Sequence, residues 1–409
     1  MPQSNMLAAI AAHGSRAIET PLNLREVGRL RVLQALYDAQ SLTRSGLART
    51  TGLSRATVSS VASDLLAAGL LEEGQPDLGD QVTGRPGQPL TLRPSAAYAL
   101  GADIGHQHIR VALCDLSGTP VWSRTTLCEV DHAPHETLNL IADLIARALR
   151  EGHVDPAKVL GLGVDIAAPI RSGNGQLEAR GIMAGWVGFQ PAKELQQRTG
   201  LPTRVENDAT VGARAERKYG AGKDVDDMIY VRLSAGIGAG IISGGRPVRG
   251  AGGLAGEIGH IVVVPNGLIC RCGNRGCLET VASPAAIAQL LSDSWRSSVS
   301  VTDLVTLLNS GDPSALRALN DAAEQVGRVL ATVVTLLNPE LIVIGGDLAG
   351  AGHNLIEPIS RAITRHALSP AVENLRVTVA ELGEHAEVLG AATMILDGAP
   401  GILAAQLAR

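Results

Sequence analysis

Aromatic side chains are scarce in this chain of 409 residues, which holds one Phe, three Trp and four Tyr. Hydrophobic residues nevertheless make up 45% of the sequence, so its cores must be built mainly from Ala, Val, Leu and Ile. Charged residues contribute only 18%, a balance that favours folded domains over long disordered segments. The length predicts two or three domains.

The chain also lacks the marks of export and of membrane insertion. Its five cysteines are an odd number, which gives no framework of disulfides. No basic segment followed by a sustained apolar one opens the chain, and we expect no apolar run of membrane-spanning length. These absences predict a cytoplasmic protein without membrane contact. Residues 1–22 are expected to form a flexible N-terminal segment.

Lysine is absent from residues 1–95, where nine Arg and eight acidic residues give a net charge of +1, while the rest of the chain carries −6. Six of these Arg lie between Arg25 and Arg55, where the acidic residues are Glu26 and Asp38. This local basic excess indicates an anionic partner, although the solvated face of a helix has a similar composition. The order of helices in the same region supports the first interpretation.

Three helical segments follow one another there. Apolar residues at helical spacing predict a helix over residues 24–37, and a short helix is predicted over residues 43–51. A turn around Gly52 leads to a longer helix with Ser54 as its N-cap. This order predicts a helix-turn-helix. Its interior is expected to consist of Ala48, Leu53, Val58, Val61 and Leu65.

The N-terminal end of the longer helix carries side chains that suit base edges in a major groove, since Arg bonds guanine bidentately and Ser and Thr reach bases or phosphates. Residues 84–87 suit the tip of a hairpin, and Leu90 and Leu92 suit its returning strand. This hairpin would be the wing, and Arg85 at its tip could enter a narrow minor groove. Residues 23–95 are therefore predicted to be a winged helix-turn-helix that binds operator DNA. The alternative is a docking or dimerisation module without nucleic acid. The candidate DNA contacts are Arg44, Ser54, Arg55, Thr57, Ser59, Ser60 and Arg85.

Three of the five cysteines lie close together in the sequence, and a histidine precedes the first of them by ten residues. Thiolate and imidazole are donors that zinc prefers, and one His with three Cys closes a tetrahedral shell without an open position for water. The pattern predicts a structural Zn2+ site, with three buried, inert thiols as the alternative. The carboxylates of Glu257 and Glu279 flank this site and are not needed as ligands. The predicted ligands are His260, Cys270, Cys272 and Cys277.

Strands and helices alternate from residue 98 to the C-terminus. Residues 98–126 and 228–250 each predict a set of strands joined by glycine turns. Together with the intervening helices they predict an α/β domain, residues 98–409, of two lobes with a binding cleft between them. The predicted helices cover residues 135–150, 209–219, 284–295, 321–337 and 354–366, and further strands cover residues 159–165 and 341–344.

Four motifs in this domain resemble the ROK family of sugar kinases and sugar-responsive repressors. They are ENDA at 206–209, the glycine-rich segment 235–260 that ends in GEIGH, CRCGNRGCLE at 270–279 and NPELIVIGGDL at 338–348. The resemblance covers roughly residues 100–396, and the preceding winged helix-turn-helix resembles the repressor branch. The resemblance implies a two-lobed actin-like (ribonuclease H-like) ATPase fold, a bound zinc, and a homodimer or homotetramer.

The resemblance also implies which residues meet the ligand. In this family, sugar hydroxyls are met by an Asn-Asp pair, by the Glu and His of GEIGH and by the Glu after the last zinc cysteine. Carboxylates accept hydrogen bonds from hydroxyls, and a zinc-bound imidazole keeps one ring nitrogen to donate. The Asn often found upstream of the Gly185-Trp186 motif is replaced here, which leaves the identity of the sugar open. The expected sugar contacts are Asn207, Asp208, Glu257, His260 and Glu279.

The phosphate-binding motifs of the family's kinases are altered in this chain. Their Asp-x-Gly-Gly-Thr-Lys loop corresponds to residues 103–108, where bulky His106 replaces a glycine, and their Gly-Thr-Gly turn reads Ser234-Ala235-Gly236. Because backbone amides and a hydroxyl must approach nucleotide phosphates closely, we expect sugar binding without efficient ATP use. Asp208 then occupies a vestigial general-base position. We expect a sugar-responsive transcription regulator, most simply a repressor of carbohydrate genes; the alternative is an active sugar kinase with a DNA-binding arm.

Overall fold

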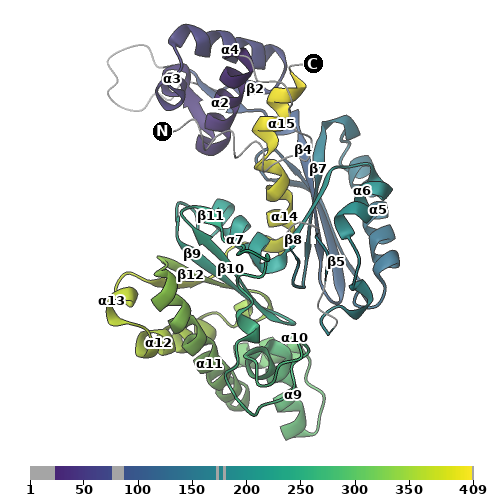
Figure 1. The fold of residues 1–409 in the computed structure, drawn as a ribbon, viewed down its shortest axis with the longest axis vertical. Helices are drawn as coiled ribbons and strands as arrows, with labels where there is room; N and C mark the ends of the chain where they lie inside the picture. The colour runs from purple at the N-terminus through teal and green to yellow at the C-terminus, as the bar shows by residue number, and fades with distance from the viewer. Residues whose placement is uncertain (1–23, 76–86, 172–174, 178–180, 408–409) are drawn as a thin grey trace.

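The computed structural model describes residues 24–75, 87–171, 175–177 and 181–407 of the chain. Within these residues there are one three-stranded sheet and two five-stranded sheets. The small sheet and its helices lie at one end of the molecule, and the two large sheets follow toward the other end (Figure 1). The predicted N-terminal segment, residues 1–22, lies outside the described residues.

The N-terminal body confirms the predicted winged helix-turn-helix. Its elements are α2 (Leu24–Ala39), β1 (Ser41–Thr43), α3 (Arg44–Thr51), α4 (Arg55–Ala67), β2 (Leu71–Glu73) and β3 (Pro89–Leu92). Helix α3 begins where Thr43 accepts a hydrogen bond from the amide of Gly46, and it ends at Gly52, whose φ of 71° terminates the helix. Helix α4 begins after Ser54, which accepts a hydrogen bond from the amide of Thr57 as an N-cap.

The wing is formed by strands β2 and β3, which pair antiparallel, and β1 adds to the other side of β3. Leu90 in the central strand is fully buried, so it joins the sheet to the helices. The two strands of the wing are therefore present as predicted. The tip of the wing and Arg85 fall within residues 76–86, which lie outside the described part of the chain.

The first large sheet forms the lobe that follows the winged helix, and its strand order is β6-β5-β4-β7-β8. Its elements are β4 (Tyr98–Ile104), β5 (His108–Asp115), β6 (Pro120–Leu127), α5 (Pro134–Glu151), β7 (Val159–Ile166), α6 (Pro191–Thr199) and β8 (Thr203–Asn207). Helices α5 and α6 cover one face, while α14 (Ala386–Leu396) covers the other (Figure 1). Because both faces are covered, β4 and β7 are almost entirely buried.

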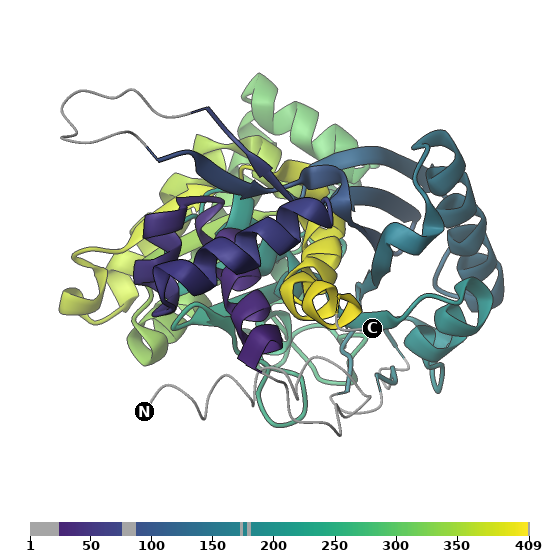
Figure 2. The ribbon, with the colours of Figure 1, turned by 90° about the horizontal axis from the view of Figure 1, so that it is seen from above.

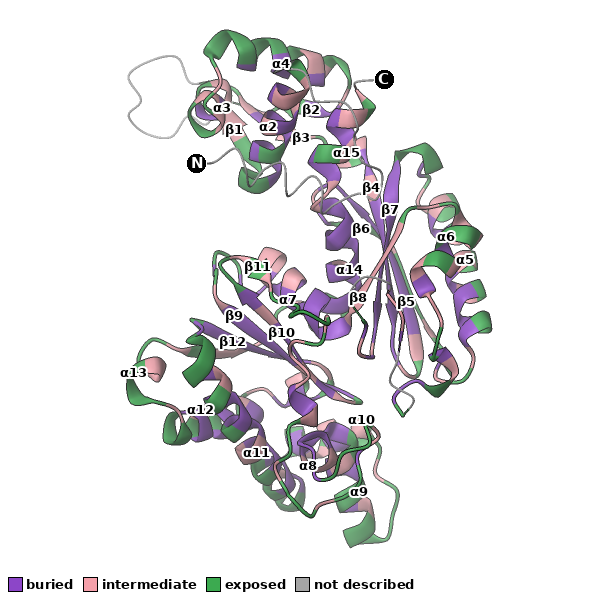
Figure 3. Ribbon diagram, viewed as in Figure 1, coloured by how far each residue is buried: buried purple, intermediate pink, exposed green. Residues whose placement is uncertain are grey.

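The second large sheet forms the other lobe, in the order β11-β10-β9-β12-β13. Helices α9, α11 and α12 bury their apolar sides against one face of it and leave their outer sides exposed (Figure 3). Helix α11 begins at Pro313, earlier than the predicted residue 321, because Asp312 caps it. The elements are β9 (Met228–Leu233), β10 (Ile237–Ser243), β11 (Arg246–Pro247), α8 (Glu279–Ala282), α9 (Pro284–Trp295), α10 (Val301–Ser310), α11 (Pro313–Leu337), β12 (Leu341–Gly345), α12 (His353–His366), α13 (Ser369–Val372) and β13 (Arg376–Val379).

The two large sheets share one connectivity. In each, three strands form an antiparallel meander, and two later strands add in parallel beside the first of them. Helix α7 (Asp208–Tyr219) lies between the lobes and contacts β8 of one sheet and β9 and β10 of the other. This duplication confirms the predicted α/β class and the two-lobed actin-like fold.

The C-terminal helices return to the N-terminal body. Helix α14 leads into α15 (Ala399–Gln406), which packs beside α2 (Figure 2). The run Gly383–Gln406 has the length and composition of a membrane span, contrary to our expectation that no such run exists. However, 67% of its most apolar window is buried inside the protein, where it contacts β4, β7 and α2. It is therefore a core segment that joins the winged helix to the first lobe.

Candidate functional site

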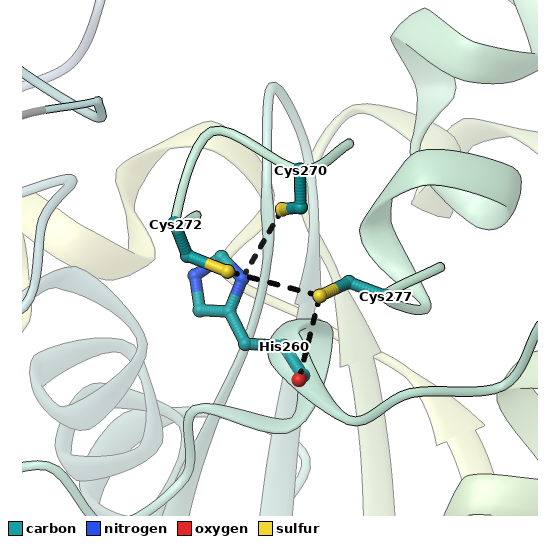
Figure 4. Close-up of side chains that lie close together, drawn as sticks. All are labelled: His260, Cys270, Cys272 and Cys277. Carbon is teal, nitrogen blue, oxygen red and sulfur yellow. Dashed lines mark hydrogen bonds between the residues drawn. The ribbon is translucent and has the colours of Figure 1, made fainter. Parts of the chain in front are cut away.

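The four predicted metal ligands converge in space (Figure 4). Their donor atoms all lie within 4.8 Å of one another, with 3.7 Å between the sulfurs of Cys272 and Cys277 and 3.6 Å between Cys270 Sγ and His260 Nδ1. A tetrahedral zinc ion bound at about 2.3 Å would separate two sulfur ligands by about 3.8 Å. The sulfurs are too far apart for a disulfide. The donor set and its spacing therefore fit a structural zinc ion.

The loop that carries the three cysteines is held by backbone contacts. Val262 bridges to Cys277, and Ile269 bridges to Arg275, so the loop folds back on itself. A Cβ on Gly276 would lie 1.6 Å from the carbonyl oxygen of Val264, and this residue has a φ of 72°. Glycine is required there because the two backbone segments touch.

A cleft between the two lobes adjoins this loop, and it holds about 410 Å³ of empty space, part of it open to solvent. The cleft brings together all five expected sugar contacts: Asn207, Asp208, Glu257, His260 and Glu279. The lobes contribute different groups, since Asn207 ends β8, Asp208 begins α7, and the other three residues belong to the second lobe. Their contact with a sugar remains a prediction.

Asn207 and Asp208 are placed by the start of α7. Asn207 is the N-cap, because its side-chain oxygen accepts a hydrogen bond from the amide of Thr210 at 3.2 Å, and its amide nitrogen donates to the carbonyl of Ala168 at 3.4 Å. Asp208 is the first residue of the helix, and its Oδ2 lies 3.1 Å from Arg232 NH1. Both side chains are therefore held by partners at the edge of the cleft.

Glu279 and Glu257 have different surroundings. Glu279, at the start of α8, accepts hydrogen bonds from the amide of Ile237 at 3.2 Å and from Arg271 Nε at 2.9 Å. Burial and, to a smaller extent, the negative charges of Asp208 and Glu279 together raise the pKa of Glu257 to about 7. Glu279 is therefore paired with an arginine, whereas among the described residues the ion-pair partner of Glu257 is the imidazole of His260.

His260 joins the metal site to the cleft. Its Nδ1 faces Cys270, while its Nε2 lies 3.8 Å from Glu257 Oε2. Burial lowers the pKa of His260, which favours the neutral imidazole that zinc requires. One nitrogen thus faces the cysteine cluster, and the other lies toward Glu257 in the cleft.

Two arginines and a histidine in the cleft were missed by the sequence analysis as ligand-site residues. Arg232 lies on β9, and Arg271 lies between two of the metal ligands. Arg271 NH1 is 3.4 Å from His106 Nε2, and His106 Nδ1 is 2.7 Å from Asp131 Oδ1. This chain of contacts connects the two lobes across the cleft. The position of Arg271 within the cysteine motif was a signal that could have identified it.

Internal ion pairs occupy the region of the altered phosphate loop. Asp103 Oδ2 lies 3.0 Å from His108 Nε2 and 3.4 Å from Arg110 NH1. Burial acts to raise the pKa of Asp103, but His108, Arg232 and Arg110 outweigh it and hold the pKa below its ordinary value. Asp165 on the neighbouring strand is fully buried, and burial together with the charge of Asp103 raises its pKa well above the ordinary value. Asp103, His108 and Arg110 are therefore paired with one another at the end of β4.

The predicted recognition helix presents a polar face. Arg55, Thr57, Ser59 and Ser60 are all exposed on α4, while Val58 on the opposite side is fully buried. Two other candidates have intramolecular partners: Ser54 Oγ lies 2.8 Å from Thr57 Oγ1, and Arg44 NH2 lies 2.6 Å from Glu73 Oε1 on the wing strand β2. The exposed face remains available to DNA, and contact with bases remains a prediction for all of these residues.

A winged helix-turn-helix joined to a duplicated actin-like domain, with a cysteine-rich loop at the cleft, defines a DNA-binding module attached to a two-lobed ligand-binding domain. The chain belongs to the ROK family, whose sequence profile matches residues 99–397. A profile of the MarR family matches residues 20–80.

Relatives of two kinds are similar to this chain. The xylose repressor of Caldicellulosiruptor bescii is 27% identical over 388 residues, covering 91% of this chain and 96% of its own. The DNA-binding transcriptional dual regulator NagC of Escherichia coli K12 is 30% identical over 412 residues, covering 92% and 96%. A glucokinase of Halalkalibacterium halodurans is 31% identical over 318 residues, covering 74% and 96%. The regulators therefore match nearly the whole chain, whereas the kinase match has about the length of the two-lobed domain.

A solved structure supports the same division. The crystal structure of a ROK family transcriptional regulator, described as a homolog of the E. coli MLC protein, is similar with a TM-score of 0.77. It is 26% identical in sequence, and the match covers 94% of this chain and 99% of that one. The winged helix and the two lobes therefore occur together in a known regulator.

Proposed function

We propose that the protein is a sugar-responsive transcription regulator of the repressor type. The winged helix, residues 23–95, binds operator DNA, and the two-lobed domain, residues 98–409, binds a sugar or sugar derivative in its cleft. One observation carries this proposal: a single chain combines an exposed polar face on α4 with a cleft that gathers five hydroxyl-binding side chains. The protein has one state that binds the operator tightly and one that binds it weakly. The sugar can change operator affinity only by as much as its own affinities for these two states differ.

We infer that the cleft is not an efficient kinase site. Arg232 contacts both Asp208 and Glu387, at 3.1 Å in each case. The carboxylate at the general-base position is therefore paired with a guanidinium of the same chain, with which a sugar hydroxyl would have to compete. His106 adds bulk where a phosphate loop requires glycine. Both features favour sugar sensing over phosphoryl transfer.

We further propose one structural Zn2+ held by His260, Cys270, Cys272 and Cys277. Four protein ligands leave no position for a reacting water, so the ion would fix the loop that carries Arg271 and precedes Glu279. The protein is proposed to act in the cytoplasm as a homodimer or homotetramer. Two recognition helices spaced about 34–36 Å apart would then read the two halves of a palindrome.

Selection of DNA from a random pool by the purified protein tests the DNA-binding part of the proposal. We expect a palindromic consensus whose binding weakens as salt rises, because phosphate contacts release counterions. D-xylose, D-glucose, N-acetyl-D-glucosamine and their phosphates would then be screened for changes in melting temperature and in DNA affinity. Failure to enrich any sequence would favour the alternative that residues 23–95 are a docking module.

A kinase assay separates the remaining alternative. The protein is incubated with Mg-ATP and the same unphosphorylated sugars, and ADP is measured. We expect no turnover in the range of about 1–100 s⁻¹ that is typical of kinases. Turnover in that range would instead identify an active sugar kinase with a DNA-binding arm.

A further inference from the structure

Helix α7 runs from the candidate sugar cleft to the winged helix. Asn207 and Asp208 at its beginning line the cleft. Lys218, near its end, contacts Tyr37 of α2 in the winged helix. Lys218 lies ten positions after Asp208, so the helix spans about 15 Å between the two places. One rigid element therefore touches both the proposed sensor and the proposed DNA-binding module.

Helices α7 and α14 are fastened to each other at both ends. Arg232 lies 3.1 Å from Asp208 at the start of α7 and 3.1 Å from Glu387 at the start of α14. At the far ends, Asp397, which follows α14, pairs with Arg214 and lies 3.0 Å from Lys218 Nζ. The ion pairs of Arg232 thus link the starts of α7 and α14, and the ion pairs of Asp397 link α14 to the later residues of α7. The two helices are therefore joined as a parallel pair.

Backbone packing prevents the two helices from sliding independently. A Cβ on Gly390 of α14 would lie only 1.9 Å from the carbonyl oxygen of Val211 on α7. No side chain separates the helices at this point, so their backbones are in direct contact. A displacement of α7 must therefore carry α14, and with it Asp397 and α15.

The far end of this pair is anchored in the winged helix through Tyr37. The ring of Tyr37 lies 3.6 Å from Lys218 Nζ, and its hydroxyl donates a hydrogen bond to Asp397 Oδ1 at 3.0 Å. Tyr37 is buried. Burial acts to raise the pKa of Asp397, but Lys218 and Arg214 hold it below its ordinary value, so the carboxylate stays charged. Beyond it, α15 packs on α2, where Arg29 NH1 donates to the carbonyl of Leu407 at 3.0 Å.

We propose that the α7–α14 pair transmits the state of the cleft to the winged helix, and that Tyr37, Lys218 and Asp397 are positioning residues that connect the two. The proposal rests on the proposed function, because it explains how sugar binding at Asp208 reaches α2. A sugar that moves the start of α7 shifts the Lys218–Asp397 contact and thereby the orientation of α2, which supports α3 and α4. The coupling follows contiguous packed elements, as energetic coupling between distant sites requires a physical connection.

The first test compares operator affinity with and without D-xylose, D-glucose or N-acetyl-D-glucosamine in four proteins. They are the wild type, Tyr37→Phe, Lys218→Met and the control Arg217→Met. Arg217 is the neighbouring cation on α7, and it pairs with Asp226, away from the winged helix. We expect a change of about 5- to 150-fold in the wild type and the control. In Tyr37→Phe and Lys218→Met the change should fall below about twofold, while the sugar-induced melting shift and DNA binding are kept.

The second test needs neither sugar nor DNA. Amide hydrogen exchange of the α2 segment 29–39 is measured in the wild type and in Asp208→Asn, which weakens the Arg232 contact at the cleft end of α7. We expect exchange in this segment to change by at least about twofold. The same substitution made in Lys218→Met should then have no effect on α2.

The outcomes separate this inference from the proposed function. A sugar response of Lys218→Met and Tyr37→Phe equal to that of the wild type would overturn the inference while leaving the regulator intact. Unchanged α2 exchange in Asp208→Asn would also overturn it. If instead no DNA or sugar binds, the proposed function fails, and the exchange measurement still decides whether α7 connects the cleft to α2.

Discussion

Replacement of Cys272 by serine isolates the contribution of the proposed zinc ion from that of core packing. Cys272 is exposed, whereas Cys277 and Cys270 are buried. Cys272→Ser therefore removes one thiolate ligand and creates almost no cavity. The hydroxyl is a much poorer ligand for zinc than a thiolate. A matched control is Cys128→Ser, because Cys128 is a half-buried thiol that does not belong to the cluster.

The size of the effect follows from linkage between metal binding and folding. A ligand that binds only the folded protein stabilises it according to its concentration relative to its dissociation constant, and a thousandfold excess corresponds to about 4.1 kcal/mol. If the loss of one of the four ligands reduces the affinity for zinc a thousandfold, the free energy of unfolding of the second lobe would fall by about 4.1 kcal/mol. The loop between Glu257 and Glu279 would loosen first, since its regular structure is limited to a short 3-10 helix, Ile258–His260, and two isolated bridges.

Zinc content by mass spectrometry, thermal unfolding and the sugar-induced melting shift form the assay. We expect one zinc per chain in the wild type and in Cys128→Ser, and little zinc in Cys272→Ser. The melting temperature and the sugar response should fall together in Cys272→Ser, while DNA binding is retained. Stoichiometric zinc in Cys272→Ser would refute the ligand assignment. A full sugar response in the zinc-free protein would refute the role of the loop in shaping the cleft.

Three further substitutions test other parts of the structure. Arg55→Ala should weaken operator binding by about 1–3 kcal/mol if its guanidinium contacts a base; fluorescence anisotropy at fixed salt measures this, and an affinity equal to that of the control Ser63→Ala, on a later exposed turn of α4, would contradict it. Ser54→Ala removes the N-cap of α4 and should lower stability by about 1 kcal/mol; chemical denaturation with an unchanged midpoint would count against the cap. Asp208→Asn should abolish the sugar-induced melting shift because it removes an acceptor for sugar hydroxyls; a wild-type shift would exclude Asp208 from the site.

Local features of this protein were predictable because their causes are local in sequence. The start of α4 depends on Ser54 and the amide three residues later, and the turn before it depends on Gly52. The cluster of one His and three Cys was recognisable because the three cysteines lie within one short loop. The alternation of buried strands and amphipathic helices indicated the α/β class for the same reason.

The segment that connects the two functional regions was not predictable in this way. Helix α14 is buried on nearly all sides, so its sequence has no amphipathic period that would mark it as a helix with one inner face. Its return to the winged helix depends on contacts with β4 and β7, which lie far away in sequence. No local sequence pattern predicts the contact of α14 with these strands.

The sequence by itself thus determined the helix-turn-helix and the cluster of one His and three Cys, since each depends on residue spacing within a short stretch, and its repeated strand pattern indicated the two lobes. The tertiary structure decided which groups meet in the cleft. It pairs Asp208 with Arg232 and places Arg271 against His106, and it brings Tyr37 to Lys218 and Asp397. These contacts join residues from different lobes and from opposite ends of the chain, because helix packing and sheet order, rather than local spacing, fix the distances between them.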